Sequence, residues 1–133
     1  MQNIKSSSFS EKKWCVVIPT YNNDTTLERV LQEVLEICPN VIVVNDGSTD
    51  NTPKILSKFS GKIDYIQHNS NEGKGKSLRD AFKYAIAEFN YAITIDSDGQ
   101  HYPKDIHSFV NAIEKYPGSI IVGARDLTQD GVP

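Results

Sequence analysis

The chain has little of what marks several classes of protein. No stretch approaches the roughly 18 consecutive apolar residues of a membrane-spanning helix, and Met1 to Ser10 lack the apolar segment of a signal peptide. The net charge of −3 gives no broad attraction to nucleic acid or to an anionic membrane. Repeats, low-complexity segments and internal linkers are absent from the sequence. We therefore expect an ordinary globular domain with no nucleic-acid partner.

Cysteine is also scarce. Cys15 and Cys38 have a spacing that matches no zinc or redox motif, and the three histidines, His68, His101 and His107, have no metal-ligand spacing either. Two free thiols suit a reducing compartment better than a disulfide does. The expected localisation is cytoplasmic.

The length of 133 residues is enough for one domain with a core but not for two. We expect residues 1–12 to be a polar, disordered lead-in and residues 13–133 to form the domain. Because no closing element precedes Pro133, we expect this chain to be a fragment.

Strand-like and helix-like patterns alternate along the chain. The expected strands are Trp14–Ile18, Val41–Val44, Ile63–Gln67, Tyr91–Ile95 and Ser119–Val122. The expected helices are Thr25–Ile37, Ser48–Phe59, Ser77–Phe89 and Pro103–Tyr116. This order, with short connections, predicts an α/β fold with a mostly parallel sheet covered by helices and right-handed crossovers.

Two details of the helices are predicted as well. Asp24 or Thr25 is expected to cap the first helix. In the third helix, the spacing of the apolar residues predicts one shared face, made of Leu78, Ala81, Phe82, Ala85 and Ile86.

Unusual polar residues follow the expected strands. In parallel sheets, ligands bind beyond the carboxyl ends of the strands, so these segments should meet at one edge. The segments are Pro19-Thr20-Tyr21-Asn22-Asn23, Asn45-Asp46-Gly47-Ser48, Asn69 to Lys76, Asp96-Ser97-Asp98 and Gly123-Ala124-Arg125. Their convergence predicts a binding site more strongly than any one segment does.

Asp96 and Asp98 are the most informative of these residues. Two acids at the end of an apolar strand can converge on a hard cation. A catalytic acid pair is the other reading. A calcium loop of the EF-hand type is excluded because His101 and His107 stand where glycine and an acid are needed.

The other segments are weaker signals by themselves. Pro19 to Asn23 is also typical of a simple turn, although the Tyr21 ring offers a flat surface to a nucleobase. Asp46 could accept a hydrogen bond from a base N–H, or could belong to a turn before a helix cap. Gly73-Lys74-Gly75-Lys76 opens a helix, where anions bind, but it fails both the dinucleotide fingerprint and the phosphate-loop motif.

Taken together, the motifs resemble those of family 2 glycosyltransferases, which have the Rossmann-like GT-A fold. The similar segments are Val-Val-Ile-Pro-Thr-Tyr-Asn, Val43 to Thr52, Asn71 to Gly75, Asp96 to His101 and Val122 to Arg125. The Gly-Gln-His tail after Asp98 is similar to that of dolichyl-phosphate mannose synthases and related polyprenyl-phosphate transferases. The resemblance extends from Trp14 to Arg125, and it implies that residues 13–133 are the N-terminal, nucleotide-sugar-binding portion of a longer catalytic domain.

The resemblance implies a nucleotide-diphosphate sugar, either a UDP- or a GDP-sugar, as the donor. Asp98 would ligate Mg²⁺ or Mn²⁺, and Asp96 would lie beside the ribose and the metal. The donor-binding residues implied are Pro19, Tyr21, Asn23, Asp46, Gly47, Lys74, Asp96, Ser97, Asp98, Gln100 and Arg125. Asn23 departs from the glutamate that usually follows Tyr-Asn in the family.

The implied reaction is displacement at the anomeric carbon with inversion, and the acceptor could be a polyprenyl phosphate. The acid that serves as the acceptor-site base in the family would lie beyond Pro133, so no catalytic base is expected within this chain. We expect donor binding, with weak or no transfer by the chain alone. Membrane association, at the inner face of a membrane, would come through C-terminal parts beyond it.

Two other classes of protein compete with this interpretation. A non-catalytic nucleotide-binding module would share the donor site. A phosphoacceptor receiver domain has a similar length, but it needs acids directly after its first strand, where this chain has Asn22-Asn23-Asp24.

Overall fold

The computed structural model describes residues 14–99 together with Ile106 and Asn111. Within this part, strands and helices alternate in the order β1 (Trp14–Thr20), α1 (Leu27–Leu35), β2 (Val41–Asp46), α2 (Thr52–Lys58), β3 (Asp64–His68), α3 (Lys74–Ala85) and β4 (Tyr91–Thr94). All pairs of neighbouring strands are parallel, and the order across the sheet is β3-β2-β1-β4. The α/β fold with a parallel sheet is confirmed.

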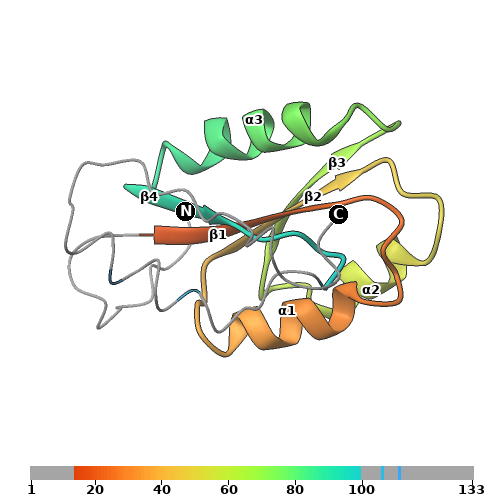
Figure 1. Cartoon of the computed structure of the whole chain (residues 1–133), viewed down its shortest axis with the longest axis horizontal. Helices are drawn as coiled ribbons and strands as arrows, with labels where there is room; N and C mark the ends of the chain where they lie inside the picture. The colour runs from red at the N-terminus through yellow and green to blue at the C-terminus, as the bar shows by residue number, and fades with distance from the viewer. Residues whose placement is uncertain (1–13, 100–105, 107–110, 112–133) are drawn as a thin grey trace, which may run out of the picture.

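Helices cover both faces of this sheet. Figure 1 shows α3 on one face and α1 and α2 on the other. Alternate side chains of a strand point to opposite faces, so Val16 packs on the side of α1 while Val17 packs against Ala81 of α3. Burial on both faces explains why β1 and β2 are apolar without interruption along most of their length.

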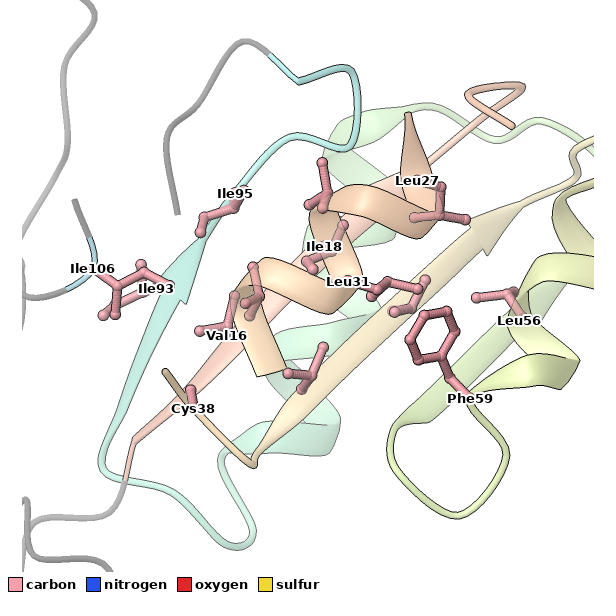
Figure 2. Packing of buried hydrophobic residues seen from close by; sticks show 14 of the residues in the cluster. Val16, Ile18, Leu27, Leu31, Cys38, Leu56, Phe59, Ile93, Ile95 and Ile106 are labelled. Atoms are coloured by element: carbon pink, nitrogen blue, oxygen red, sulfur yellow. The ribbon is translucent and has the colours of Figure 1, made fainter. Parts of the chain in front are cut away.

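The larger core lies between the sheet and helices α1 and α2. Leu27 and Leu31 from α1 lie over Ile18 of β1, and Phe59 closes the side next to α2 (Figure 2). All three aliphatic side chains are fully buried. Each contributes roughly 1.5–3 kcal/mol by leaving water, so this side of the sheet is a rigid base for the loops at its edge.

The helix starts differ from the predictions, because side chains of neighbouring loops bind the backbone there. Helix α1 begins at Leu27, and its N-cap Thr26 makes no capping bond, so capping by Asp24 or Thr25 is wrong. Helix α2 begins at Thr52 rather than Ser48. Its preceding turn is held by side chains, as when the Ser48 amide donates to Asn45 Oδ1 at 3.1 Å.

Helix α3 begins three residues earlier than predicted, at Lys74, and its apolar face divides in two. Ala81 and Ala85 are buried against the sheet, whereas Phe82 is 42% exposed and Ile86 is 80% exposed. The single shared face is therefore wrong. The residues that approach the sheet are small, because the helix lies close to β1 and β2.

Some predictions fall outside the described residues, namely the lead-in of residues 1–12 and the strand Ser119–Val122. Of the predicted helix Pro103–Tyr116, only Ile106 and Asn111 are described; both are helical, and Ile106 belongs to the buried core. Cys15 and Cys38 are free, as predicted, and both are buried. Burial raises the pKa of Cys15 to about 12 and that of Cys38 to about 11, so both thiols are unreactive.

The strand order places the binding site. The chain runs from β1 outward to β2 and β3, then crosses back so that β4 pairs with the other side of β1. The order therefore reverses between β1 and β4. Ligands of open parallel sheets bind in the crevice outside the carboxyl ends of the strands at such a reversal.

Candidate donor-binding site

A cavity of about 320 Å³ opens at the carboxyl ends of the strands. Its walls come from four separate segments of the chain, those that follow β1, β2, β3 and β4. The lining residues are Pro19, Thr20, Tyr21, Asn23, Asp46, Asn71, Gly73, Lys74, Ser77, Asp96, Ser97 and Asp98. Its volume lies in the range of small-molecule sites.

Asp96 and Asp98 line the cavity, and the buried Ser97 between them holds the segment in place. The Ser97 hydroxyl donates to Thr20 Oγ1 at 2.9 Å and accepts from Asn23 Nδ2 at 2.7 Å. Ser97 is thus anchored to β1 and to the loop before α1. This anchoring fixes the backbone from which both carboxylates project.

Lys74 lies beside the first of these carboxylates. Its Nζ is 2.6 Å from Asp96 Oδ1, and its side chain remains largely exposed. An exposed ion pair of this kind is worth about 0–1 kcal/mol. The ammonium can therefore exchange this partner for a phosphate at little cost.

Asp46 ends β2 and holds the loop that leads into α3. Its Oδ1 accepts from the Glu72 amide at 2.8 Å, and its Oδ2 accepts from the Gly73 amide at 2.9 Å. Burial alone would raise the pKa of Asp46, but hydrogen bonds from His68 and from these two amides outweigh it and hold the pKa below its usual value. Asp46 is therefore an ionised carboxylate that shapes the cavity wall.

Behind Asp46 lies a chain of charged groups, buried at His68 and half-exposed at Lys76, that the sequence interpretation missed. His68 Nδ1 is 2.8 Å from Asp46 Oδ1, and His68 Nε2 is 2.8 Å from Asp80 Oδ2. Lys76 Nζ then lies 2.9 Å from Asp80 Oδ1. The signal that could have revealed it is register, because Asp46 and His68 are direct partners at the ends of β2 and β3.

The loops that follow β1 and β2 bind each other through side chains. Asn22 Oδ1 accepts from the Thr49 amide at 2.8 Å, and the Asn22 amide donates to Ser48 Oγ at 3.0 Å. Asn22 has a φ of 54°, a left-handed conformation that asparagine tolerates. This pairing presents Tyr21, which is exposed at the cavity, in a defined position.

Gly47 is the one predicted site residue in the described part that does not line the cavity. Its φ is +75°, and a Cβ there would lie 2.4 Å from the Ser70 carbonyl carbon. The glycine lets the loop after β3 pack directly against the end of β2. Its role is close backbone approach rather than contact with the cavity.

Ser77 lines the cavity and was not among the predicted site residues. It lies in the first turn of α3, fully buried, and its hydroxyl has no hydrogen-bond partner among the described residues. A buried hydroxyl without a partner costs about 1–3 kcal/mol. A polar ligand in the cavity would offset that cost.

Eight predicted residues, Pro19, Tyr21, Asn23, Asp46, Lys74, Asp96, Ser97 and Asp98, lie around this cavity. Gln100 and Arg125 lie outside the described residues. Asn23, the departure from the family pattern, uses its side-chain amide to hold Ser97.

The acid pair fits a metal that is shared with a ligand. In the part of the chain that the structure describes, no cluster of three or more His, Cys, Asp or Glu side chains could hold a metal ion. Mg²⁺, however, is usually bound by one or two carboxylates together with phosphate oxygens and waters. Asp96 and Asp98 on one cavity wall supply that donor set.

Fold and cavity together define a Rossmann-like α/β domain with an acidic pair at its switch point. The sequence profile described as Glycosyl transferase family 2 matches residues 15–133. The chain therefore belongs to glycosyltransferase family 2, and its fold is GT-A.

Known proteins are similar to this chain in sequence or in fold. The UDP-N-acetylglucosamine–dolichyl-phosphate N-acetylglucosaminyltransferase of Methanococcus voltae is 29% identical over 133 residues, covering 87% of this chain and 53% of that protein. S. aureus TarS 1–349 in complex with UDP-GlcNAc is 29% identical, with a TM-score of 0.65 over 77% of this chain and 31% of that chain.

A third comparison supports the fold alone. Glucosyl-3-phosphoglycerate synthase of Mycobacterium tuberculosis, in complex with Mn²⁺, UDP and glucosyl-3-phosphoglycerate, has a TM-score of 0.67 at 20% identity, covering 85% of this chain and 46% of that chain. This chain spans about half the length of the curated relatives it matches. No helix among the described residues is both long and apolar enough to span a membrane.

Proposed function

We propose that this chain binds a nucleotide-diphosphate sugar as the donor of an inverting, metal-dependent glycosyl transfer. One observation carries the proposal: four chain segments, predicted separately from the sequence, line a single cavity at the switch point of the sheet. Family membership supports the same reaction class.

Each wall suits one part of the donor. The Tyr21 ring and Pro19 offer apolar surfaces to the base, and the ionised Asp46 can accept a further hydrogen bond from a base N–H because a carboxylate has about four acceptor positions. The unpartnered Ser77 hydroxyl gives the ligand one more polar contact. Lys74 would face the diphosphate.

Asp98 and Asp96 would hold Mg²⁺ or Mn²⁺, which when bound supplies Lewis-acid stabilisation of the leaving diphosphate. Lys74 would neutralise part of the charge that develops on the same group, a preorganised electrostatic contribution. The resemblance adds Arg125 and Gln100 to the proposed donor site; both lie outside the described residues.

A polyprenyl phosphate is the acceptor that the relatives favour. The Methanococcus voltae protein is named for a dolichyl-phosphate acceptor, and a Mycolicibacterium smegmatis relative is named polyprenol monophosphomannose synthase. Such an acceptor is already anionic, so it attacks the anomeric carbon without a strong general base. Asp46 and Asp96 then serve donor binding rather than proton abstraction.

Calorimetric titration with UDP and with GDP, each with and without Mn²⁺, tests the proposal. We expect metal-dependent binding of one nucleotide, reduced at least about tenfold in Asp98→Asn because a metal ligand is lost. Glu33→Gln, an exposed position on α1, is the matched control and should bind as the parent does. Absence of binding by both nucleotides would overturn the proposal.

A further inference from the structure

His68 lies between two carboxylates, and its geometry reports its charge. Both ring nitrogens are 2.8 Å from a carboxylate oxygen, one on Asp46 and one on Asp80. An ionised carboxylate only accepts hydrogen bonds, so each ring nitrogen must carry a proton. His68 is therefore an imidazolium in this arrangement.

We propose that protonated His68 is a positioning residue of the donor site: it holds the Asp46 carboxylate, and through it the loop before α3, in the shape that binds the nucleotide. This inference rests on the proposed function. His68 does not line the cavity, so it acts through Asp46, which does.

Asp46 binds both His68 and the loop before α3. Its Oδ1 accepts hydrogen bonds from both His68 Nδ1 and the Glu72 amide, while its Oδ2 accepts one from the Gly73 amide. Gly73 and Lys74 form the next part of the cavity wall. A change in the orientation of this carboxylate therefore moves the wall that faces the donor.

Loss of one proton from His68 would break this arrangement. Neutral imidazole has one donor nitrogen and one acceptor nitrogen, so one of the two carboxylates would face a lone pair. Either Asp46 would turn and release the Glu72 and Gly73 amides, or Asp80 would separate and loosen α3. Both outcomes weaken the site.

The charges around His68 favour the protonated form. The hydrogen bond with Asp46 raises the pKa of His68 most; burial opposes it, and Asp80 and the nearby Glu72 raise it further. Asp46 comes from β2, Glu72 from the loop, and Asp80 from α3, where Lys76 pairs with it. Two buried or half-buried carboxylates thus outweigh one cation, and we expect His68 to stay charged at neutral pH.

The protonation state can be measured without any ligand. Long-range ¹H–¹⁵N correlation spectra of the protein at pH 7, with the His68 signals assigned through their loss in His68→Gln, should show both ring nitrogens protonated. A single-proton tautomer at pH 7 would overturn the inference.

Nucleotide affinity against pH tests the functional part. With Mg²⁺ present, UDP or GDP affinity should fall about tenfold as pH rises from 7 through the His68 titration, as expected for losing a charge-assisted hydrogen bond. His68→Gln should bind more weakly and show no such step. Asp80→Asn, which does not touch the cavity, should move the step to lower pH by about one unit because a partner of the imidazolium is gone.

Glu33→Gln is again the control, and its step should coincide with that of the parent. A parent profile that is flat up to pH 9, or a step that persists in His68→Gln, would overturn this inference and leave donor binding intact. No binding at any pH would instead overturn the proposed function and the inference together.

Discussion

Gly47 is the residue whose replacement should harm this fold most directly, because two constraints act on it at once. Its φ of +75° is strained for any residue with a Cβ, and that Cβ would lie 2.6 Å from the Asn71 amide nitrogen, a backbone atom that cannot rotate away. We expect Gly47→Ala to lower the free energy of unfolding by about 2–4 kcal/mol, measured by urea denaturation.

Gly61→Ala separates the two constraints. Gly61 has a similar φ of +83°, but a Cβ there meets nothing within 4 Å. Gly61→Ala should therefore lower the free energy of unfolding only through backbone strain, by about 1 kcal/mol. Equal losses in the two variants would contradict the close approach of the loops after β2 and β3.

Residue identity predicted much of the site and missed part of it. Tyr21, Asp46, Asp96 and Asp98 could be predicted because the carboxyl ends of parallel strands share one edge, a rule that needs no coordinates. His68 was missed: its contact with Asp46 needs the register of β2 and β3, and its contact with Asp80 needs a helix that turns Asp80 toward it.

At the scale of elements, α3 shows what periodicity can and cannot predict. Apolar spacing identified a helix here, but the spacing fits both the alanine face and the neighbouring Phe82–Ile86 face. The alanines face the sheet because their small side chains permit the helix to approach β1 and β2 closely. Which face is buried depends on the distance between α3 and the sheet, and this distance cannot be read from the sequence.

This choice makes a prediction for α3. Ala81 is fully buried against Val17 and its neighbours in the sheet, so Ala81→Leu should push the helix outward and cost about 1–3 kcal/mol of stability. Phe82→Ser, one residue further on, should cost below about 1 kcal/mol, because that side chain is 42% exposed. Urea denaturation of both variants measures the difference, and a larger loss in Phe82→Ser would mean that the other face is the buried one.

The loop geometry at helix starts was the least predictable part of the elements. Asp24 was expected to cap α1, yet its carboxylate accepts from the Asn51 amide at 3.1 Å, while the Asp24 amide donates to Asp50 Oδ2. These bonds join residues 26 and 27 positions apart. Local propensity favours a cap within one segment, whereas the reciprocal pairing exists only once the two loops lie side by side.

At the scale of the whole molecule, the same edge of the sheet carries both the cavity and the groups that titrate. Asp46 and Asp50 hold neighbouring loops. Burial alone would raise the pKa of Asp50, but hydrogen bonds from Thr52 and from the Asp24 amide outweigh it and lower the pKa. His68, at the end of β3, has a raised pKa from its hydrogen bond with Asp46. Stability should therefore respond to pH from two sides.

The direction of each response follows from linkage. A carboxylate with a lowered pKa in the folded state stabilises above its unfolded value of about 4, and that contribution is lost as pH falls through the folded pKa. His68, with a raised pKa, stabilises fully below about 6.5, and its contribution is lost as pH rises through the folded pKa. We expect the highest stability between about pH 4 and 6.5, with a decline on each side.

Urea midpoints measured from pH 2 to 9 test this expectation, and two variants assign the two declines. His68→Gln should be less stable than the parent at pH 6 and should lose the alkaline decline, because the titrating ring is gone. Asp50→Asn should be less stable at neutral pH and should show a shallower acid decline, because the Thr52 and Asp24 contacts no longer depend on a charge at position 50. A parent midpoint that stays constant between pH 6 and 9 would show that the His68 imidazolium contributes nothing to the stability of the fold. The hydrogen-bonded chain from Asp46 to Lys76 would then have to be stable without that charge.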